Sequence, residues 1–285
     1  MIPDIWTRKE KRIFLRERTS MEITVRDKNG TVLAKAAHPE EVSLCLDHQW
    51  NDGDAVEITA PPCSHLWARM NAAIPEGEIY CPNGHMIWHV PAGEHRLAYA
   101  PGVFSASRNI LSVRMMTESE LALLRDIARN PLDLRGETDF FPHCTANVET
   151  RNESVFAARN VIDGLRYNTY HGEWPFESWG IGAREDAWCR IDFGRCVIAE
   201  KMMLTLRADF PHDAYWVSGH VVDSESGDVA FTLQKTGERQ CIDLGGRRIS
   251  WLRLERMVKS DDPSAFPSLR AWEVIGKDDT SISGL

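Results

Sequence analysis

Trp188-Cys-Arg-Ile-Asp192-Phe-Gly194-Arg-Cys-Val197 is the segment that says most about the architecture of this chain. Its first part, residues 189–193, is typical of a short β-strand bounded by a turn residue. Gly194 permits the turn that follows, because glycine adopts backbone conformations that other residues avoid. The segment therefore predicts a strand that ends at Asp192-Phe-Gly194.

Similar short apolar runs continue through the second half of the chain. We expect further strands at residues 198–207, 216–222, 229–234, 240–244, 249–254 and 269–275. Glu225-Ser-Gly-Asp228 predicts a tight turn between two of them. Strands and helices do not alternate in this half, which excludes a parallel nucleotide-binding sheet.

The first half shows the same organisation. Strands are expected at residues 21–26 and 31–35, and Asn29-Gly30 between them is the strongest short signal for a β-hairpin. Further strands are expected at residues 42–46, 55–59, 65–70, 86–90, 96–99 and 110–116. Many short strands with regular glycine and proline turn signals favour a β-sandwich.

A single helix is expected between the two halves. Thr117-Glu-Ser-Glu120 matches a capping box, in which the side chain at each end bonds the backbone amide of the other. One apolar stripe at helical spacing follows, made of Leu121, Leu124, Ile127 and Ala128. Asn130-Pro131 ends the helix, since proline disfavours helical backbone in the residue before it.

We therefore predict an all-β protein of two β-sandwich domains joined by one α-helix. The N-terminal sandwich spans residues 1–116, the linking helix and connector span 117–138, and the C-terminal sandwich spans 139–285. The length of 285 residues agrees with two domains, since domains average roughly 100–200 residues each.

Charge and composition exclude several classes of partner. The chain has 42 acidic and 33 basic residues, a formal net charge of −9. Binding to a nucleic-acid backbone needs a clustered basic surface, so no nucleic-acid partner is expected. No run approaches the roughly 18 apolar residues of a membrane span, so no membrane partner is expected either.

Cysteine usage and the N-terminus favour a cytoplasmic location. The seven cysteines are odd in number and never form a Cys-x-x-Cys pair, which favours reduced thiols. The first twenty residues lack the apolar stretch of a secretory signal.

The sequence leaves the oligomeric state open, and a homo-oligomer is one of the states that it allows.

Three motifs follow one another in the second half: Asn160-Val-Ile-Asp163-Gly164, then an aromatic-rich loop with the segment 188–197, and finally Glu273-Val-Ile-Gly276. In this order and spacing they resemble a discoidin domain. That is the coagulation-factor C-type, galactose-binding-like jelly roll, which family 32 carbohydrate-binding modules also use. The resemblance covers residues 140–276, about half of the chain, and the N-terminal half is placed in no named family.

The resemblance also implies a structural Ca²⁺ beneath the ligand loops, held here by Asp163, Asn168 and Glu273. Calcium takes six to eight oxygen ligands, which carboxylates and backbone carbonyls can supply. This chain lacks the threonine that the family usually carries later in the same loop. The alternative is an Asx-turn at Asp163 without a metal.

Two segments, residues 166–180 and 207–216, are dense in aromatic and charged side chains. The resemblance places both on one rim of the C-terminal sandwich. Aromatic rings cover the C–H face of a sugar while polar groups bond its hydroxyls, and binding sites combine such apolar walls with a few placed polar groups. The predicted ligand-binding residues are Tyr170, His171, Glu173, Trp174, Trp179, Arg207, Asp209, His212 and Trp216.

Each part of this set has an expected role. Trp174 and Trp179 would stack on the sugar, while Arg207 and Asp209 would bond its hydroxyls. His171 and Glu173 would line the rim. The alternative is that the tryptophans are inward-pointing anchors of a long loop and that Arg207 belongs to a structural ion pair.

Carbohydrate binding is the function that these patterns favour, with a carbohydrate ligand as the partner. One alternative is a cytoplasmic carbohydrate-active enzyme of the glycoside hydrolase or lyase type that uses the same loops. Its catalytic candidates are His171, Glu173, Asp209, His212 and Asp213. A second alternative is a protein–protein adhesion module, which predicts a contiguous exposed apolar patch on the rim.

Overall fold

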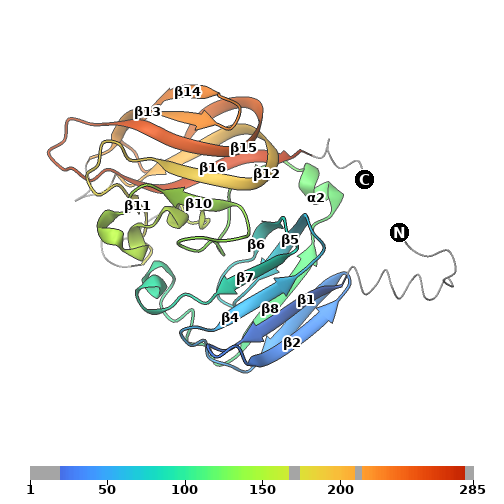
Figure 1. Ribbon diagram of the computed structural model, residues 1–285. Coiled ribbons are helices and arrows are strands. Elements are labelled where there is room, and N and C mark those ends of the chain that lie inside the picture. Colours follow the sequence, from blue (N-terminus) through green and yellow to red (C-terminus); the bar gives the residue numbers. More distant parts are fainter. Residues whose placement is uncertain (1–19, 167–173, 209–213, 280–285) are drawn as a thin grey trace.

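The computed structural model describes residues 20–166, 174–208 and 214–279, and over this part the protein is almost entirely β. The strands fall into two groups, which we call the first β-unit (β1–β8) and the second β-unit (β9–β16), and Figure 1 shows the second lying above the first. The predicted all-β class is confirmed. The predicted domain limits stay a prediction.

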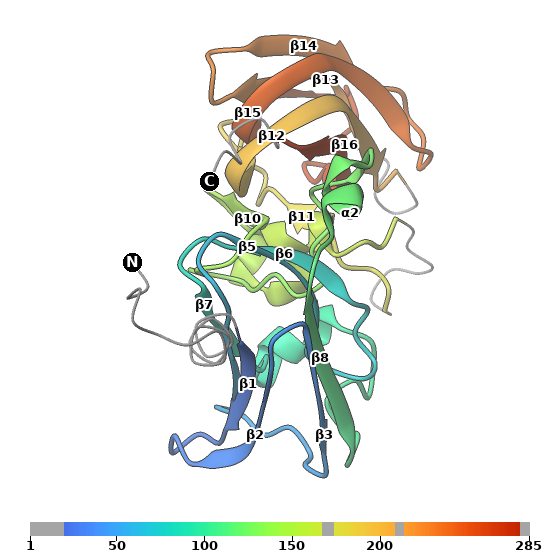
Figure 2. The ribbon, with the colours of Figure 1, turned by 90° about the vertical axis from the view of Figure 1, so that its right-hand side faces the viewer.

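The first β-unit consists of two four-stranded antiparallel sheets. Their strand orders are β2-β1-β4-β7 and β3-β8-β5-β6. The bounds are β1 (Met21–Arg26), β2 (Val32–His38), β3 (Glu41–Leu46), β4 (Ala55–Thr59), β5 (Ser64–Arg69), β6 (Gly77–Cys81), β7 (His85–His89) and β8 (Asn109–Met115). Figure 2 shows the sheet that contains β1, β2 and β7 facing the sheet that contains β3 and β8.

Side-chain alternation explains this packing. Buried and partly exposed positions alternate along β5, so that one face of the strand enters the core. Ile23, Trp88 and Val113 come from both sheets and are completely buried in one hydrophobic cluster. The Asn29-Gly30 hairpin is confirmed, because β1 and β2 pair antiparallel across it.

The second β-unit is built around one eight-stranded antiparallel sheet. Six strands follow the order β11-β16-β12-β15-β13-β14, while β10 pairs with β12 and β9 with β16. The bounds are β9 (Arg125–Asp126), β10 (His143–Ala146), β11 (Trp179–Gly180), β12 (Cys189–Leu206), β13 (Trp216–Asp223), β14 (Asp228–Thr232), β15 (Gln240–Lys259) and β16 (Ser268–Asp278). A separate hydrophobic cluster fills this unit.

The prediction that a strand ends at Gly194 is wrong, because β12 continues through it. Gly194 has φ +65°, and the pairing register with β15 shifts between Asp192 and Val197. The glycine therefore produces a bulge that lets one long strand bend, rather than a chain reversal. The two strands predicted within β15 are likewise one strand.

Helical structure is limited to short segments. They are the 3-10 helices η1 (Gly93–Ala98), η2 (Thr150–Asn152), η3 (Ser154–Phe156) and η4 (Ala158–Ile162), and the single-turn helix α2 (Glu118–Ala122). The strand predicted at residues 96–99 is wrong, since η1 occupies that position, and β6 was not predicted. Among the described residues, no helix has the length and apolar character needed to cross a membrane.

The predicted linking helix begins as expected but ends after one turn. Its capping box is confirmed, because Glu120 N donates to Thr117 Oγ1 at 3.3 Å and Thr117 N donates to Glu120 Oε2 at 2.8 Å. Asp126 then pairs with Ile275 as part of β9, and Ile127 is buried in the turn that follows. Pairing with β16 and burial thus outweigh the helical periodicity of this segment.

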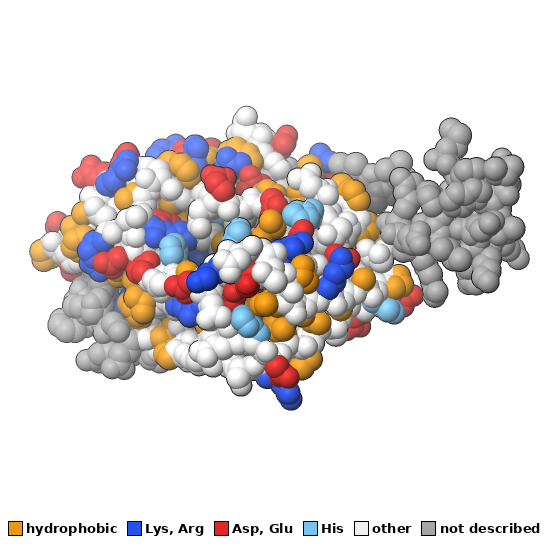
Figure 3. Space-filling model, turned by 60° about the horizontal axis from the view of Figure 1, so that its bottom comes forward, with side chains coloured by type: hydrophobic (Ala, Val, Ile, Leu, Met, Phe, Trp, Pro, Cys, Tyr) orange, Lys and Arg blue, Asp and Glu red, His pale blue; other side chains and the backbone are white. Residues whose placement is uncertain are grey.

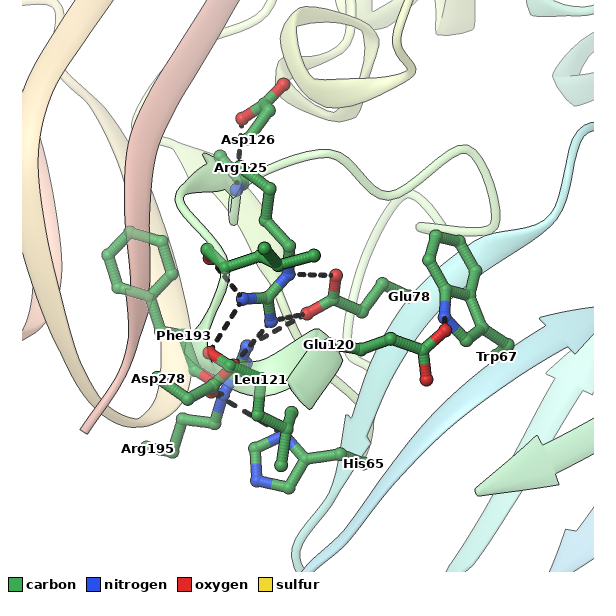
Figure 4. A network of polar contacts seen from close by, with 12 residues as sticks. His65, Trp67, Glu78, Glu120, Leu121, Arg125, Asp126, Phe193, Arg195 and Asp278 are labelled. Atoms are coloured by element: carbon green, nitrogen blue, oxygen red, sulfur yellow. Dashed lines mark hydrogen bonds and ion pairs between the residues drawn. The ribbon is translucent and has the colours of Figure 1, made fainter. Parts of the chain in front are cut away.

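A buried network of charged side chains joins the two β-units (Figure 4). Arg125 of β9 donates to Glu78 of β6 at 2.7 Å and also to Asp278 of β16, which in turn accepts from Arg195. His65 Nδ1 lies 3.5 Å from Asp278 Oδ1. Burial and the neighbouring Arg195 lower the pKa of His65 to about 4, so this histidine is neutral at pH 7. Two guanidinium groups therefore balance two carboxylates at the junction.

Candidate functional site

A cleft of about 610 Å³, here called the rim cleft, lies between loops of the second β-unit and η1 of the first. Its walls come from the segment that carries η2 and η3, from the segment around β11, from the loop before β16, and from η1 of the first β-unit. The lining residues include Glu94, Leu97, Arg151, Phe156, Phe176 and Phe266. A cleft of this size is within the range of small-molecule binding sites.

Three phenylalanines give the cleft its apolar character. Phe266 is 49% exposed although it is a large aromatic side chain, while Phe176 is partly buried and Phe156 is buried. An exposed aromatic ring inside a cleft indicates a binding site, because a face of the ring is available to a ligand. A single exposed apolar residue on a convex surface carries no such indication.

Charged groups stand at the edge of the same cleft. The Arg151 guanidinium lies 5.1 Å from the centre of the Phe156 ring and makes two hydrogen bonds of 2.7 Å to Glu153. These hydrogen bonds lower the pKa of the Glu153 carboxyl, which keeps it ionised. The cleft therefore combines aromatic faces with an exposed pair of hydrogen-bonding groups.

Two buried arginines fix the loops beneath the cleft. Arg207 Nη1 donates to Phe176 O at 2.5 Å, and Arg207 N donates to Ser268 O at 2.9 Å. Arg270 Nη2 lies 3.2 Å from Asp163 Oδ2 and 3.3 Å from Glu177 Oε1. These contacts tie the segment before β11 to the end of β12 and the start of β16. The two segments selected from the sequence are thus linked through Arg207.

The structure corrects the ligand-binding role predicted for Trp179, Trp216 and Arg207. The two tryptophan rings stack in the core with their centres 6.0 Å apart, and no more than 1% of either residue is exposed. Arg207 is also 1% exposed and bonds the loop backbone. All three side chains are buried, and Trp179 has the inward-pointing position of the alternative interpretation. The ion-pair partners expected for Arg207, Asp209 and Asp213, lie outside the described residues.

The remaining predicted residues are divided. Trp174 is partly buried and lines a separate cavity of about 180 Å³, together with Tyr99 and Arg159, rather than the rim cleft. Trp174 therefore does not line the rim cleft, and its stacking on a sugar stays a prediction. The other members of the ligand-binding and catalytic sets lie outside the described residues: Tyr170, His171, Glu173, Asp209, His212 and Asp213.

The described part of the predicted calcium site does not fit a calcium ion. Asp163 faces the Arg270 guanidinium and accepts the Leu165 amide at 2.7 Å, which is an Asx-turn. Glu273 accepts two hydrogen bonds from Arg239, at 2.8 and 3.0 Å. Both carboxylates are thus already neutralised by arginines, while the third predicted ligand, Asn168, lies outside the described residues. No cluster of three or more His, Cys, Asp and Glu suited to a metal occurs in the described ranges.

Sequence reasoning missed most of the cleft. Phe266 lies next to Pro267, just before β16. An aromatic residue in a loop at that position was the sequence feature that could have indicated a binding residue. Arg151 has φ +52°, which no sequence pattern indicated. Glu94 and Leu97 come from the first β-unit, and nothing in the sequence connected them with the second.

Comparisons with known proteins give matches among solved structures alone. No protein-family model matches the chain, and no curated protein sequence matches it. A chitosan-binding module from a chitosanase/glucanase of Paenibacillus sp. IK-5 matches with 18% identity and a TM-score of 0.38, covering 54% of this chain and 100% of that one.

Two further matches are sugar-binding domains. A Streptococcus pneumoniae fucose binding module has 19% identity and a TM-score of 0.36, covering 53% of this chain and 97% of that one. The lectin domain of lectinolysin, complexed with Lewis B antigen, has 15% identity and a TM-score of 0.39, covering 53% and 95%. The structural neighbours are thus carbohydrate-binding modules, but likenesses this weak carry no argument about the ligand of this chain.

Proposed function

We propose that the protein binds a carbohydrate in the rim cleft of the second β-unit. The observation that carries this proposal is the exposed ring of Phe266 inside a cleft that Phe176 and Phe156 also line. A pyranose has a face of C–H bonds and an edge of hydroxyl groups. The phenylalanines supply the apolar surface for the face, and the charged groups at the edge supply hydrogen-bond partners.

Arg151 and Glu153 are suited to bind hydroxyl groups. Their side chains are 64% and 37% exposed, so their mutual ion pair is worth little in water. A sugar hydroxyl can therefore insert into this pair at low cost. The guanidinium donates to a hydroxyl oxygen, and the carboxylate accepts from a hydroxyl hydrogen.

The charge state of Glu153, a carboxyl that lines the cleft, favours binding over hydrolysis by this side chain. A glycosidase needs one carboxyl with a raised pKa to act as general acid. The pKa of Glu153 is instead lowered by its hydrogen bonds from Arg151. The catalytic candidates from the sequence lie outside the described residues, so hydrolysis stays a prediction without support from the described part of the cleft.

A glycan array followed by calorimetric titration tests the proposal. Phe266→Ala should weaken binding of the best glycan by roughly tenfold or more, because the ring supplies much of the contact with the sugar face. Ile110→Ala is the matched control, since Ile110 of β8 is also 49% exposed but belongs to the first β-unit. The proposal fails if no glycan binds, or if Phe266→Ala binds as the parent does.

A further inference from the structure

We propose that the first β-unit completes this cleft through η1, and that Glu94 there selects glycans carrying protonated amino groups over acidic glycans. The inference rests on the proposed function, because it names the ligand class of the same cleft. It also gives the first β-unit a role in recognition. The argument uses the attachment of η1, the charge that lines the cleft, and one exposed leucine.

η1 is fixed against the second β-unit by two hydrogen bonds. Ser154 N of η3 donates to Glu94 Oε1 at 2.5 Å, and Ser154 Oγ donates to Glu94 O at 2.9 Å. On its other side, Arg96 Nε donates to Pro91 O at 2.7 Å and its guanidinium lies 5.2 Å from the Phe104 ring centre. The wall made by η1 is therefore held in place from both β-units.

The charge of the cleft comes from three lining residues. Arg151 and Glu153 neutralise each other, which leaves Glu94 as the source of one net negative charge. Among the described residues, Glu94 has no cationic partner, and its carboxylate accepts one hydrogen bond, from the Ser154 amide. Its second oxygen keeps its capacity to accept, which suits an ammonium or hydroxyl donor.

The charge of the whole chain acts in the same direction. A formal net charge of −9 repels polyanionic glycans at a distance and attracts polycationic ones. Complementary charge contributes mainly to selectivity and association rate. We therefore expect glucosamine oligomers to bind more tightly than their N-acetylated forms, and oligogalacturonates to be rejected.

Leu97 provides an apolar contact from the same wall. It is 60% exposed, and it lines the cleft together with Phe156 and Phe266. Such an exposed leucine on a fixed element covers part of a sugar face without forming part of the core. Its effect should be the same for charged and neutral glycans, which separates it from Glu94.

Calorimetric titration of the full chain at pH 6 and low salt tests the inference. The probes are hexamers of glucosamine, N-acetylglucosamine and galacturonic acid. Glu94→Gln should weaken glucosamine binding roughly 5- to 10-fold and change N-acetylglucosamine binding by less than about twofold. Glu118→Gln is the matched control, since Glu118 is an exposed glutamate on α2, away from η1 in Figures 1 and 2, and it should change neither.

A second pair of variants tests the wall itself. Leu97→Ser should weaken every bound glycan about 3- to 10-fold, whereas Leu124→Ser, at the same 60% exposure, should not. If Phe266→Ala abolishes binding while Glu94→Gln and Leu97→Ser leave it unchanged, the cleft binds glycans but the role of η1 is wrong. If no glycan binds at all, the proposed function itself falls.

Discussion

At the scale of single residues, Arg270 determines how the floor of the cleft is built. Its side chain is fully buried and faces two acidic side chains, Asp163 and Glu177. Burial raises the pKa of Glu177, while the charge of Arg270 acts against that rise. The guanidinium therefore offsets much of the cost of burying acidic groups, and it couples the loop before β11 to strand β16.

Asp126 is the residue for which we predict the clearest dependence on pH. Burial raises its pKa to about 7, although its Oδ1 accepts the amides of Val274 and Ala128 at 3.0 and 3.2 Å. An unfolded aspartate has a pKa of about 3.9. The folded state therefore binds more protons between these values, and its contribution to stability falls as pH rises from about 4 to about 7.

The Asp126→Asn variant should consequently be more stable than the parent at pH 8, by about 1–3 kcal/mol, and nearly equal to it at pH 4. Asparagine keeps the oxygen that accepts both amides and loses the ionisation. Urea unfolding at the two pH values measures the difference. The control is Asp27→Asn, for which the change in stability should have the opposite sign. Backbone hydrogen bonds lower the pKa of the exposed Asp27, so replacing this carboxylate should make the protein less stable at pH 8. A loss at pH 8 for Asp126→Asn would contradict this account.

At the scale of elements, the bulge in β12 requires a glycine, because there is no room for a side chain at position 194. Gly194 has φ +65°, and a Cβ at this position would lie 2.3 Å from Cδ2 of the Phe141 ring. The ring therefore occupies the space that any other residue would need. This close approach lets β12 bend while it stays paired with β15 and β16.

Gly194→Ala should lower the free energy of unfolding by about 2–4 kcal/mol, measured by urea denaturation, since it adds backbone strain and a clash. Gly30→Ala isolates the strain, because Gly30 has φ +80° with nothing within 4 Å of its added Cβ. That variant should lose only about 1 kcal/mol. Equal losses for the two variants would show that the contact with Phe141 does not matter.

At the scale of the whole molecule, the two β-units are held together by a charge-balanced junction. Arg125 and Arg195 face Glu78 and Asp278 in a largely buried setting (Figure 4). Burial acts to raise the pKa of Asp278, but Arg195 and Arg125 outweigh it and hold the pKa below its usual value. The stability of the junction therefore depends on the balance between positive and negative charges as well as on the contacts between them.

Arg125→Met should destabilise the protein by about 3–5 kcal/mol in calorimetric melting at pH 7, because two buried carboxylates would share one guanidinium. The double variant Arg125→Met with Glu78→Gln restores one positive and one negative charge. It should regain a substantial part of the loss. If the double variant is less stable than Arg125→Met alone, charge balance is not what matters at this junction.

The outer surface of the first β-unit differs from the cleft. Figure 3 shows hydrophobic side chains interspersed with charged ones over the described part of the face that it presents. The exposed apolar residues that share one concave surface, Leu97 and Phe266, lie instead where η1 meets the second β-unit. The proposed carbohydrate site therefore lies where the two units meet.

The sequence alone determined the features that depend on neighbouring residues. The hairpin at Asn29-Gly30 and the capping box of Thr117 and Glu120 were predicted correctly, because a turn or a cap is stabilised within a few residues. Most strands were also predicted, since a period of two in a strand records which face is buried. The all-β class follows from those local signals.

Tertiary structure decided which side chains reach a ligand. Trp179 and Trp216 look like sugar-binding residues in the sequence, but packing against each other removes them from solvent. The cleft joins Glu94 to Ser154 across 60 residues, and Arg270 reaches Asp163 across 107. Exposure depends on the packing of distant segments, and no local pattern records that packing.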